Sequence, residues 1–361
     1  MKIAIYTISK NEEKHVERWY ESTKEADYHV IADTGSTDRT VEIARGLGIT
    51  VIPIHIFPFR FDDARNASLA VVPKDADYCI ALDMDEVLTP GWRKPVEEAF
   101  ARGADRLHYR RIEAFNPDGS VASEFNGFKV HRREGIRWHY PIHEVPQWYK
   151  EEPETKEQIT GFETHHLQDK TKSRGQYLPM LEMAVKESPE ARNLYYLGRE
   201  YFYRQMYKEC ADTLKKYLEK SIFKAEMGYA MRMLAKCEPE EAEEWLTKSI
   251  ETFPSREALL ALANHYYLTK QWAECVLVAT EALKVTQKPT EFLSEGWAWG
   301  HMADDLIAVC SWQLKDYKKA YKHGKAAAEM SPEDERLQKN LAFYKEKKNA
   351  NVRPTGRRGK K

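Results

Sequence analysis

The sequence changes its periodicity about halfway along its 361 residues. In the first half, short runs of β-branched and apolar residues alternate with amphipathic stretches, a pattern typical of alternating strands and helices. Beyond about Pro189 only helical periodicity remains. Four strands are expected in the first half, over Ile3–Ile8, His29–Ala32, Thr50–His55 and Tyr78–Leu82. The chain is long enough for two cores, and the change in pattern predicts an α/β domain followed by an all-α domain.

The alternation in the first half predicts a mostly parallel, Rossmann-like sheet with helices on both faces. Amphipathic stretches such as "EEKHVERWYEST" and "DRTVEIARGLG" supply helices between the strands. In open sheets of this kind, ligands bind at the edge formed by the carboxyl ends of the strands. We therefore expect the functional residues to follow directly after strands.

The second half contains a repeat of paired helices. Four frames, which start at Ala191, Phe223, Arg256 and His301, carry a small residue at their eighth and at their twentieth position. The eighth positions are Gly198, Ala230, Ala263 and Ala308, and the twentieth positions are Cys210, Ala242, Cys275 and Ala320. Small residues on both helices of a hairpin allow close packing. This spacing favours tetratricopeptide-like units over an ordinary helical bundle, with an insert around "KPTEFLSEGWAWG" in the longest frame.

Composition excludes several classes of protein. The formal net charge is -1, so no overall positive field points to nucleic acid. The five cysteines, Cys79, Cys210, Cys237, Cys275 and Cys310, form no CxxC pair, which predicts reduced core residues of a cytoplasmic protein. The N-terminus turns polar too soon for a signal peptide, and no apolar run is long enough to cross a bilayer. We expect no membrane partner, and nothing in the sequence fixes an oligomeric state.

The run "CIALDMDEVL" places three carboxylates directly after a buried strand. Asp83, Asp85 and Glu86 follow the apolar residues Cys79–Leu82. A polar loop after a strand is the plain explanation. Carboxylates at a strand end also converge on one point, and hard cations take oxygen ligands. A metal site is therefore the second explanation.

Three other segments lie at the same expected edge of the sheet. In "TISKNEE", Ser9 and Glu12 have the spacing of a helix capping box. Asp33 closes the second strand, ahead of a turn at Gly35. Arg65 lies near the start of a helix in "FDDARN", and an arginine near paired carboxylates can hold a diphosphate. Asp33 and Arg65 are therefore candidate ligand-binding residues.

Four motifs together resemble those of family-2 inverting glycosyltransferases of the GT-A fold. "TISKNEE", "DTGSTDRT", "FDDARN" and "LDMDE" occur in that family's order and approximate spacing. The segment that begins "HHLQDKTKSRGQY" resembles the junction in cytoplasmic glycosyltransferases that carry C-terminal tetratricopeptide repeats. We accordingly expect a GT-A domain over residues 1–185, a tetratricopeptide-like helical domain over 186–345 and a disordered basic tail over 346–361.

The resemblance implies roles for individual residues. Asp83 and Asp85 match the metal-binding DXD motif, in which the second aspartate binds a divalent ion, manganese or magnesium, and the first contacts ribose or water. Arg65 matches an arginine that contacts the nucleotide, which Asp83 also helps to bind. The residues that match the nucleoside pocket are Thr7, Ser9, Asn11, Glu12 and Asp33. The metal ion holds the sugar diphosphate and takes up the charge of the leaving group.

Two later segments contribute histidines and a carboxylate. One residue of the pair His165 and His166 matches a late histidine that completes the metal shell, and His166 is preferred. "WHYPIHEVPQW" resembles a segment ahead of the end of the catalytic domain. An inverting displacement needs a base near the acceptor hydroxyl. Glu144 and Glu86 are the candidates, although Glu144 can instead bond a backbone turn or Arg137.

These features predict a metal-dependent glycosyltransferase that moves a sugar from a UDP-linked donor to a hydroxyl or thiol. Repeats of this kind often bind peptide, which favours a protein or peptide acceptor. Aromatic residues interleaved with arginine and lysine also suit nucleic acid, so hydroxymethylated bases of DNA are the second choice and a polysaccharide the third. A catalytically inactive repeat scaffold is the alternative from another class, and intact Asp83, Asp85 and Arg65 argue against it.

Overall fold

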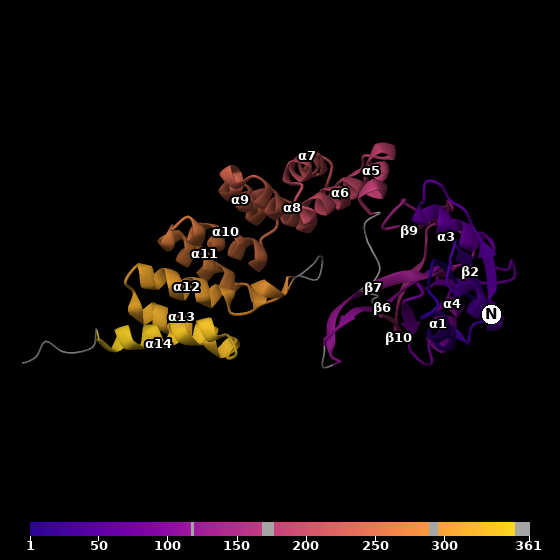
Figure 1. The fold of residues 1–361 in the computed structure, drawn as a ribbon, viewed down its shortest axis with the longest axis horizontal. Helices are drawn as coiled ribbons and strands as arrows, with labels where there is room; N and C mark the ends of the chain where they lie inside the picture. Colours follow the sequence, from indigo (N-terminus) through magenta and orange to yellow (C-terminus); the bar gives the residue numbers. More distant parts are fainter. Residues whose placement is uncertain (117–118, 168–176, 289–294, 351–361) are drawn as a thin grey trace, which may run out of the picture. The chain divides into compact units, whose positions relative to one another are not determined.

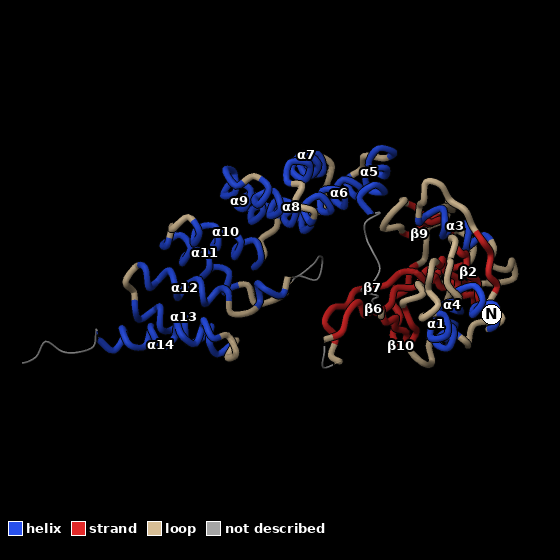
Figure 2. Tube along the Cα trace, viewed as in Figure 1, coloured by secondary structure: helices blue, strands red, loops and turns tan. Residues whose placement is uncertain are grey.

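The computed structural model describes residues 1–116, 119–167, 177–288 and 295–350, without the side chains of Ala122 and of residues 347–350. The chain divides into two compact units, Met1–Glu187 and Ser188–Lys361. Figures 1 and 2 show the strands in the first unit, and the described part of the second unit contains helices only. The expected order of an α/β region before an all-α region is confirmed. The domain boundary expected after residue 185 falls in the last turn of α5 (Tyr177–Glu187).

The first unit is built on an eight-stranded sheet with the order β3-β2-β1-β4-β7-β6-β10-β5. Strands β1 to β4 are parallel to their neighbours among themselves, and β10 is parallel to β6. Strand β7 runs antiparallel to β4 and β6, and β5 runs antiparallel to β10. The bounds are β1 (Ile3–Ser9), β2 (Tyr28–Asp33), β3 (Thr50–Pro53), β4 (Tyr78–Ala81), β5 (Glu86–Leu88), β6 (Arg106–Phe115), β7 (Val121–Arg132) and β10 (Lys156–His166).

The strands after β4 were not expected from the sequence. Charged side chains interrupt the apolar alternation of these strands: β6 buries Leu107, Tyr109 and Ile112 but also carries Arg110 and Arg111. Both arginines are paired with glutamates, from β6 itself or from its neighbours. Cross-strand ion pairs of this kind can replace polar–apolar alternation on a sheet face. A second, two-stranded sheet joins β8 (Ile136–His139) to β9 (Val145–Trp148).

Helices cover both faces of the main sheet, as predicted. On one face, α1 (Val16–Thr23), α2 (Thr40–Gly46) and α4 (Arg93–Ala101) pack in a core with Ile3 and Ile5. On the other, α3 (Phe61–Ala70) and the β8–β9 sheet pack in a core with Ala4 and Tyr6. Because successive side chains of a strand point to opposite faces, β1 serves both cores.

The capping box expected at Ser9 and Glu12 is wrong. Ser9 is the last residue of β1, and α1 begins only at Val16, with His15 as its N-cap. The backbone N–H of His15 donates to the Glu12 carbonyl at 2.7 Å, which forms a turn ahead of the helix. The Ser9 hydroxyl instead donates to Asp33 on the neighbouring strand at 2.9 Å. Ser9 therefore bonds to Asp33 of the neighbouring strand and does not cap a helix.

The second unit consists of helix hairpins in the predicted register. The pairs are α6 (Ala191–Tyr203) with α7 (Tyr207–Leu218), α8 (Lys224–Cys237) with α9 (Ala242–Thr252), α10 (Arg256–Leu268) with α11 (Trp272–Lys284), and α12 (Met302–Gln313) with α13 (Tyr317–Met330). All eight small residues named above are buried. A Cβ on Gly198 would lie 2.5 Å from Leu214 Cδ2, so a larger residue at this position would collide with α7. The tetratricopeptide-like architecture is confirmed.

Short 3-10 helices and a final long helix complete this unit. The 3-10 helix η1 (Pro239–Glu241) precedes α9, and η2 (Gly296–Trp299) lies in the expected insert, of which residues 289–294 are outside the described residues. Helix α14 (Glu335–Ala350) continues past residue 346, where the tail was expected to begin. The rest of the expected tail, residues 351–361, lies outside the described residues.

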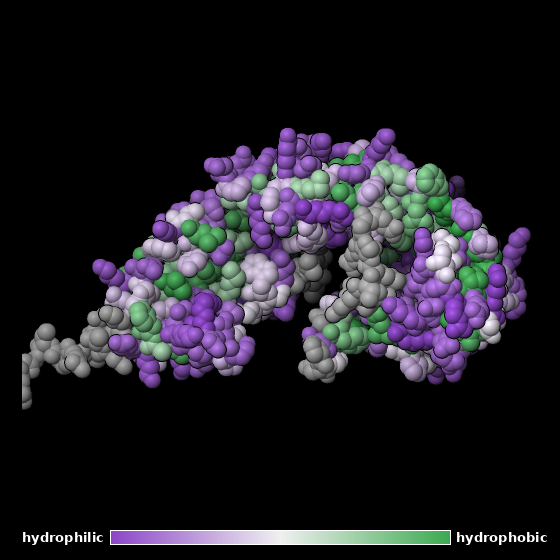
Figure 3. Space-filling model, in the orientation of Figure 1, coloured by the Kyte–Doolittle hydropathy of each residue, from purple (hydrophilic) through white to green (hydrophobic). Residues whose placement is uncertain are grey.

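Among the described residues, no helix combines the length and the apolar character that a bilayer crossing needs. Figure 3 shows hydrophilic and hydrophobic residues intermixed on the visible face of both units. Cys79, Cys210, Cys275 and Cys310 are buried free thiols and Cys237 is half-buried, which agrees with the expected reduced core residues.

Candidate active site

The carboxyl ends of β1, β2 and β4 lie at one edge of the sheet because these strands are parallel neighbours. Ser9, at the end of β1, is in register with Asp33, at the end of β2. Asp83 follows the end of β4 by two residues. The segments that the sequence singled out therefore start from the same edge, as expected for parallel strands.

Asp33 is engaged by hydrogen bonds from within the protein. Its Oδ1 accepts from the hydroxyls of Ser9 at 2.9 Å and Ser36 at 2.5 Å. Its Oδ2 accepts from the backbone N–H groups of Gly35 at 3.1 Å and Ser36 at 2.9 Å. Burial raises the pKa of Asp33, but the bonds from Ser36, Ser9 and Gly35 outweigh burial and keep that pKa below its ordinary value. This geometry supports a role for Asp33 in ordering the turn after β2.

Asn11 and Glu12 join the loop after β1 to the loop after β2. The Asn11 side-chain oxygen accepts from the Thr37 N–H at 2.7 Å, and the Glu12 N–H donates to the Thr40 hydroxyl at 2.7 Å. Asn11 adopts a φ of 55°, a left-handed conformation that asparagine tolerates better than most residues. Thr7 is fully buried. These candidates shape the loops at the sheet edge, and their contact with a nucleoside stays a prediction.

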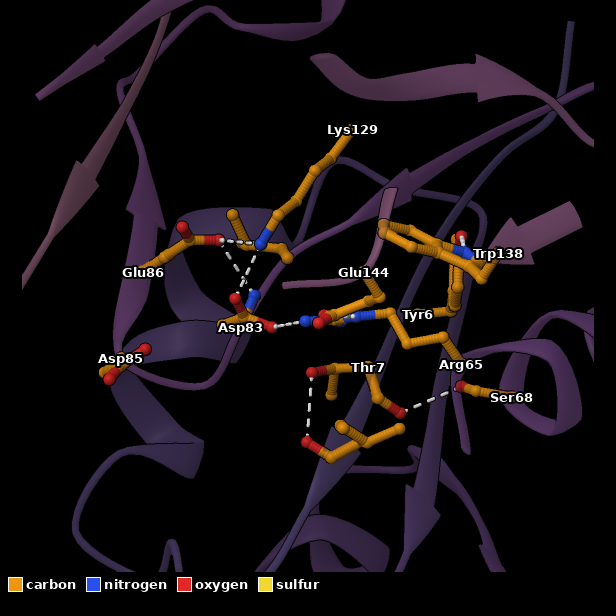
Figure 4. Close-up of polar contacts among 12 residues, drawn as sticks. Tyr6, Thr7, Arg65, Ser68, Asp83, Asp85, Glu86, Lys129, Trp138 and Glu144 are labelled. Atoms are coloured by element: carbon orange, nitrogen blue, oxygen red, sulfur yellow. Dashed lines mark hydrogen bonds and ion pairs between the residues drawn. The ribbon is translucent and has the colours of Figure 1, made fainter. Parts of the chain in front are cut away.

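The buried Arg65 lies at the centre of an ion-pair cluster (Figure 4). It is 3% exposed. Its Nη2 donates to Asp83 Oδ1 at 2.5 Å and its Nε donates to Glu144 Oε1 at 2.7 Å. The guanidinium carbon lies 5.0 Å from the centroid of the Trp138 ring, within the range of a cation–π interaction. Arg65 therefore joins two carboxylates from segments far apart in the sequence.

Lys129, on β7, holds the second oxygen of Asp83. The Lys129 Nζ lies 2.6 Å from Asp83 Oδ2 and 3.8 Å from Glu86 Oε2. Burial raises the pKa of Asp83, but the positive charges of Arg65 and Lys129 outweigh it and hold that pKa well below its ordinary value. Asp83 is thus a carboxylate fixed between two cations, and the structure does not group it with Asp85.

Glu86 is buried, and both of its oxygens face partners within the protein. It is 1% exposed. Its Oε2 accepts from the Asp83 N–H at 3.0 Å, and its Oε1 forms an ion pair with Arg111 of β6. A general base must reach the acceptor proton. This placement favours Glu144 over Glu86 as the candidate base.

Glu144 is positioned by a clamp between α3 and β8. The side-chain amide of Asn66 both donates to the Trp138 carbonyl at 2.9 Å and accepts from the Trp138 N–H at 2.8 Å. In the loop that follows β8, the Pro141 carbonyl accepts from the Phe61 N–H at 2.9 Å. The partner of Glu144 in this arrangement is Arg65, and not Arg137 as one explanation had it. The side chain of Glu144 is 12% exposed.

Figure 4 shows Asp85 beside the Asp83 cluster, with no contact drawn between the two aspartates. The partner of Asp85 is His166. Asp85 Oδ2 lies 3.4 Å from His166 Nε2, and Glu113 Oε1 lies 3.2 Å from His166 Nδ1. Hydrogen bonding to Asp85 and to Glu113 raises the pKa of His166 to about 10. His165 instead lies 3.3 Å from Glu163, because consecutive residues of β10 point to opposite faces. Of the two histidines, His166 is the one beside Asp85.

The Asp85–His166 pair fits a divalent cation. Two neighbouring ligands at roughly 2.1 Å from one octahedral ion are roughly 3 Å apart, close to the 3.4 Å between Asp85 Oδ2 and His166 Nε2. In the described residues, no group of three or more His, Cys, Asp or Glu side chains is arranged to hold a metal. Two protein ligands are sufficient where substrate phosphates and waters supply the others.

Several residues in these clusters were not indicated by any sequence pattern. Two strands that were not expected from the sequence supply three of them: Arg111 and Glu113 lie on β6, and Lys129 lies on β7. Each is a single charged residue in a strand and belongs to no motif. Trp138 lay in a segment that the sequence had singled out for its histidines and Glu144. A periodicity of two along β6, which places Arg111 and Glu113 on one face, is the one signal that pattern analysis had available.

A series of buried polar contacts holds the Trp138 ring, which Arg65 contacts, in place. The Trp138 Nε1–H donates to the Tyr6 hydroxyl at 2.7 Å, and that hydroxyl lies 2.8 Å from His131 Nε2. His131 Nδ1 lies 2.6 Å from the Arg132 carbonyl, a contact that requires a proton on Nδ1. Burial lowers the pKa of His131 to about 4. His131 is therefore neutral and accepts the Tyr6 proton.

The buried contacts among Trp138, Tyr6 and His131 predict a loss of stability in mild acid. The folded state keeps His131 neutral while the unfolded state binds a proton near its ordinary pKa, so stability is complete above that pKa and falls as the pH drops toward the folded value. Between about pH 7.5 and about pH 5 the loss from His131 alone is about 2 kcal/mol. Urea unfolding at both values should show that His131→Gln loses about 2 kcal/mol less than the wild type. Equal losses in the two proteins would contradict a buried neutral His131.

Comparison with known proteins identifies the first unit. Residues 4–166 match the sequence model of Glycosyl transferase family 2. Residues 4–166 form a glycosyltransferase family 2 domain. The predicted resemblance is thereby confirmed, and its match ends at His166, the last residue of β10 and the partner of Asp85.

A curated relative and several solved structures are also similar. An uncharacterized glycosyltransferase of Rickettsia bellii (strain RML369-C) is 33% identical over 101 residues, which are 28% of this chain and 33% of that protein. The match thus covers about a third of the relative's length. A thermophilic TPR protein of Thermus thermophilus covers 46% of this chain and 88% of its own, at 16% identity and a TM-score of 0.32. YrrB, described as a TPR protein with an unusual peptide-binding site, covers 47% and 82%, at 19% identity and a TM-score of 0.37.

Proposed function

We propose that this chain is a metal-dependent inverting glycosyltransferase that acts in the cytoplasm, with a UDP-sugar as donor and a protein or peptide as acceptor. One observation carries the proposal. In a glycosyltransferase family 2 domain, the edge of the sheet where the parallel strands end holds a partly buried Arg65–Asp83–Lys129 cluster and, next to it, an Asp85–His166 pair. Cationic side chains and a divalent cation each stabilise the charge of a sugar diphosphate.

The donor side of the reaction uses the loops after β1 and β2 and the charged cluster. The loops joined by Asn11, Glu12 and Asp33 present the nucleoside pocket. Asp85 and His166 would hold a manganese or magnesium ion, and this ion would stabilise the negative charge of the departing diphosphate. Arg65 and Lys129 lie at the same edge and are held in place by Asp83. Groups that are already fixed need little reorganisation in the transition state.

The acceptor side uses Glu144. In an inverting displacement, the acceptor oxygen or sulfur forms a bond to the anomeric carbon while the bond from that carbon to the phosphate oxygen breaks. The diphosphate leaves with the electron pair, and the acceptor proton goes to a carboxylate. Glu144 has one oxygen bonded to Arg65. Within the part of the chain that the structure describes, no group bonds its Oε2, which leaves that oxygen for the proton.

A protein or peptide acceptor is supported by the second unit. It is a repeat of helix hairpins that exposes apolar side chains, including Ile222 at 95%, Leu268 at 68% and Tyr203 at 61%. Exposed apolar residues on a repeat scaffold offer contacts to an extended chain. The formal net charge of -1 gives no comparable support to DNA as the acceptor.

The test is a transfer assay with radiolabelled UDP-sugars, with and without manganese, against pools of protein, hydroxymethylated DNA and polysaccharide. We expect slow hydrolysis of one UDP-sugar that requires manganese, and labelling in the protein pool. Labelled DNA whose formation falls steeply with salt would replace the proposed acceptor by the nucleic-acid alternative. Absence of both hydrolysis and binding for every UDP-sugar would favour the inactive scaffold.

A further inference from the structure

The Asp85–His166 pair continues into β6 through Glu113. Strands β10 and β6 are parallel, with His165 in register with Ile112. The next residues, His166 and Glu113, are therefore neighbours, and the alternation of side chains along each strand places both on the other face. Glu113 Oε1 lies 3.2 Å from His166 Nδ1, a buried nitrogen that makes no hydrogen bond of regular geometry with the described residues, so Glu113 is the carboxylate placed to accept its proton. His166 Nε2 lies 3.4 Å from Asp85 Oδ2.

Glu113 is itself held in place. Arg111, two residues earlier on the same face of β6, donates from Nη2 at 3.1 Å and from Nε at 3.2 Å to Glu113 Oε2. Arg111 also forms an ion pair with the buried Glu86. One oxygen of Glu113 is therefore fixed by an arginine that is anchored in the core, and its other oxygen faces the histidine.

We propose that Glu113 is a positioning residue for the metal site: it accepts the Nδ1 proton of His166 and so directs the Nε2 lone pair toward a cation held with Asp85. The inference rests on the proposed metal-dependent function. A neutral imidazole binds metal through one nitrogen only when the other carries the proton, and a carboxylate behind that nitrogen fixes both the tautomer and the ring orientation. Loss of such a partner typically weakens metal binding 10- to 100-fold.

The chain contains a matched control. Glu163 lies 3.3 Å from His165 on the opposite face of the same strand, so Glu163→Leu removes a glutamate–histidine contact without touching the Asp85 side. Glu113→Leu removes the carboxylate at similar side-chain size. Glu113→Gln keeps a carbonyl oxygen that can still accept the Nδ1 proton, and it leaves a folded protein to measure if the leucine variant is unstable.

The experiment measures Mn²⁺ binding to the full chain by electron paramagnetic resonance in the presence of UDP, together with the Mn²⁺ concentration for half-maximal UDP-sugar hydrolysis. We expect Kd for Mn²⁺ to rise 10- to 100-fold in Glu113→Leu, less in Glu113→Gln, and not at all in Glu163→Leu. Turnover at saturating Mn²⁺ should stay within about threefold of the wild type in Glu113→Gln, since that variant is impaired in binding the ion and not in the transfer step.

The outcomes separate this inference from the proposed function. If the wild type binds Mn²⁺ and both Glu113 variants bind it with the same Kd, the role of Glu113 is overturned. The metal site itself would remain supported. A wild-type protein that binds no Mn²⁺ with UDP would overturn the metal site and the role of Glu113 together. If Glu163→Leu raises the Kd for Mn²⁺ as much as Glu113→Leu does, the effect is a general response of the sheet to a lost glutamate. That result would also overturn the proposal.

Discussion

Replacing Asp85 with asparagine is expected to reduce sugar transfer by about 10³-fold or more, because the loss of a carboxylate ligand removes several kcal/mol of charge stabilisation from the leaving diphosphate. The fold should survive the change. Asp85 lies in the loop between β4 and β5 and belongs to neither hydrophobic core of the first unit. An asparagine of similar size can still form a hydrogen bond with His166, the partner of Asp85. Transfer rates at saturating UDP-sugar and manganese, and the melting temperature, are the two measurements.

Asp75→Asn is the matched control for this experiment. Asp75 precedes β4 where Asp85 follows it, and its exposed side chain pairs with Lys2. An exposed ion pair contributes little to stability, so this variant should keep both its melting temperature and its activity. Full activity of Asp85→Asn in the presence of a chelator would remove Asp85 from the proposed metal site.

Replacing Glu144 with glutamine is expected to lower turnover by on the order of 10²- to 10⁴-fold, the usual contribution of a general base. Donor and manganese binding should remain, because a glutamine oxygen can still accept from Arg65 Nε, as Glu144 Oε1 does at 2.7 Å. The measurements are kcat for transfer and the Kd values for UDP and Mn²⁺. A loss confined to kcat is the signature of a group that acts only in the chemical step.

Glu86→Gln provides the contrast. Glu86 is buried between Asp83, Lys129 and Arg111, so removing its charge leaves Arg111 without its buried partner. This change should lower thermal stability, since an uncompensated buried charge is strongly destabilising. Unchanged turnover in Glu144→Gln would show that Glu144 only holds Arg65. A large loss of turnover in Glu86→Gln at unchanged stability would then make Glu86 the base.

Several features of this protein could be predicted from the sequence because they depend on residues close together in the chain. The strands β1 to β4 are short apolar runs, and parallel strands separated by helices bring their carboxyl ends to one edge. For this reason the strand pattern was sufficient to place Asp33 and Asp83 at a common edge. The helix hairpins could also be predicted from the sequence. A pair of small residues twelve positions apart, such as Gly198 and Cys210, recurs in each of the four frames.

The sequence alone determined the two-domain order, the family of the first domain and the motifs at its strand ends, all of which are local patterns of residue type. The tertiary structure decided which charges meet. Asp83 faces Arg65 and Lys129, and Asp85 faces His166. Those pairings depend on the order of β7, β6 and β10 in the sheet and on which face each side chain takes. The order of these strands in the sheet cannot be read from spacing along the chain, since the energy of an ion pair depends on distance in space and on burial.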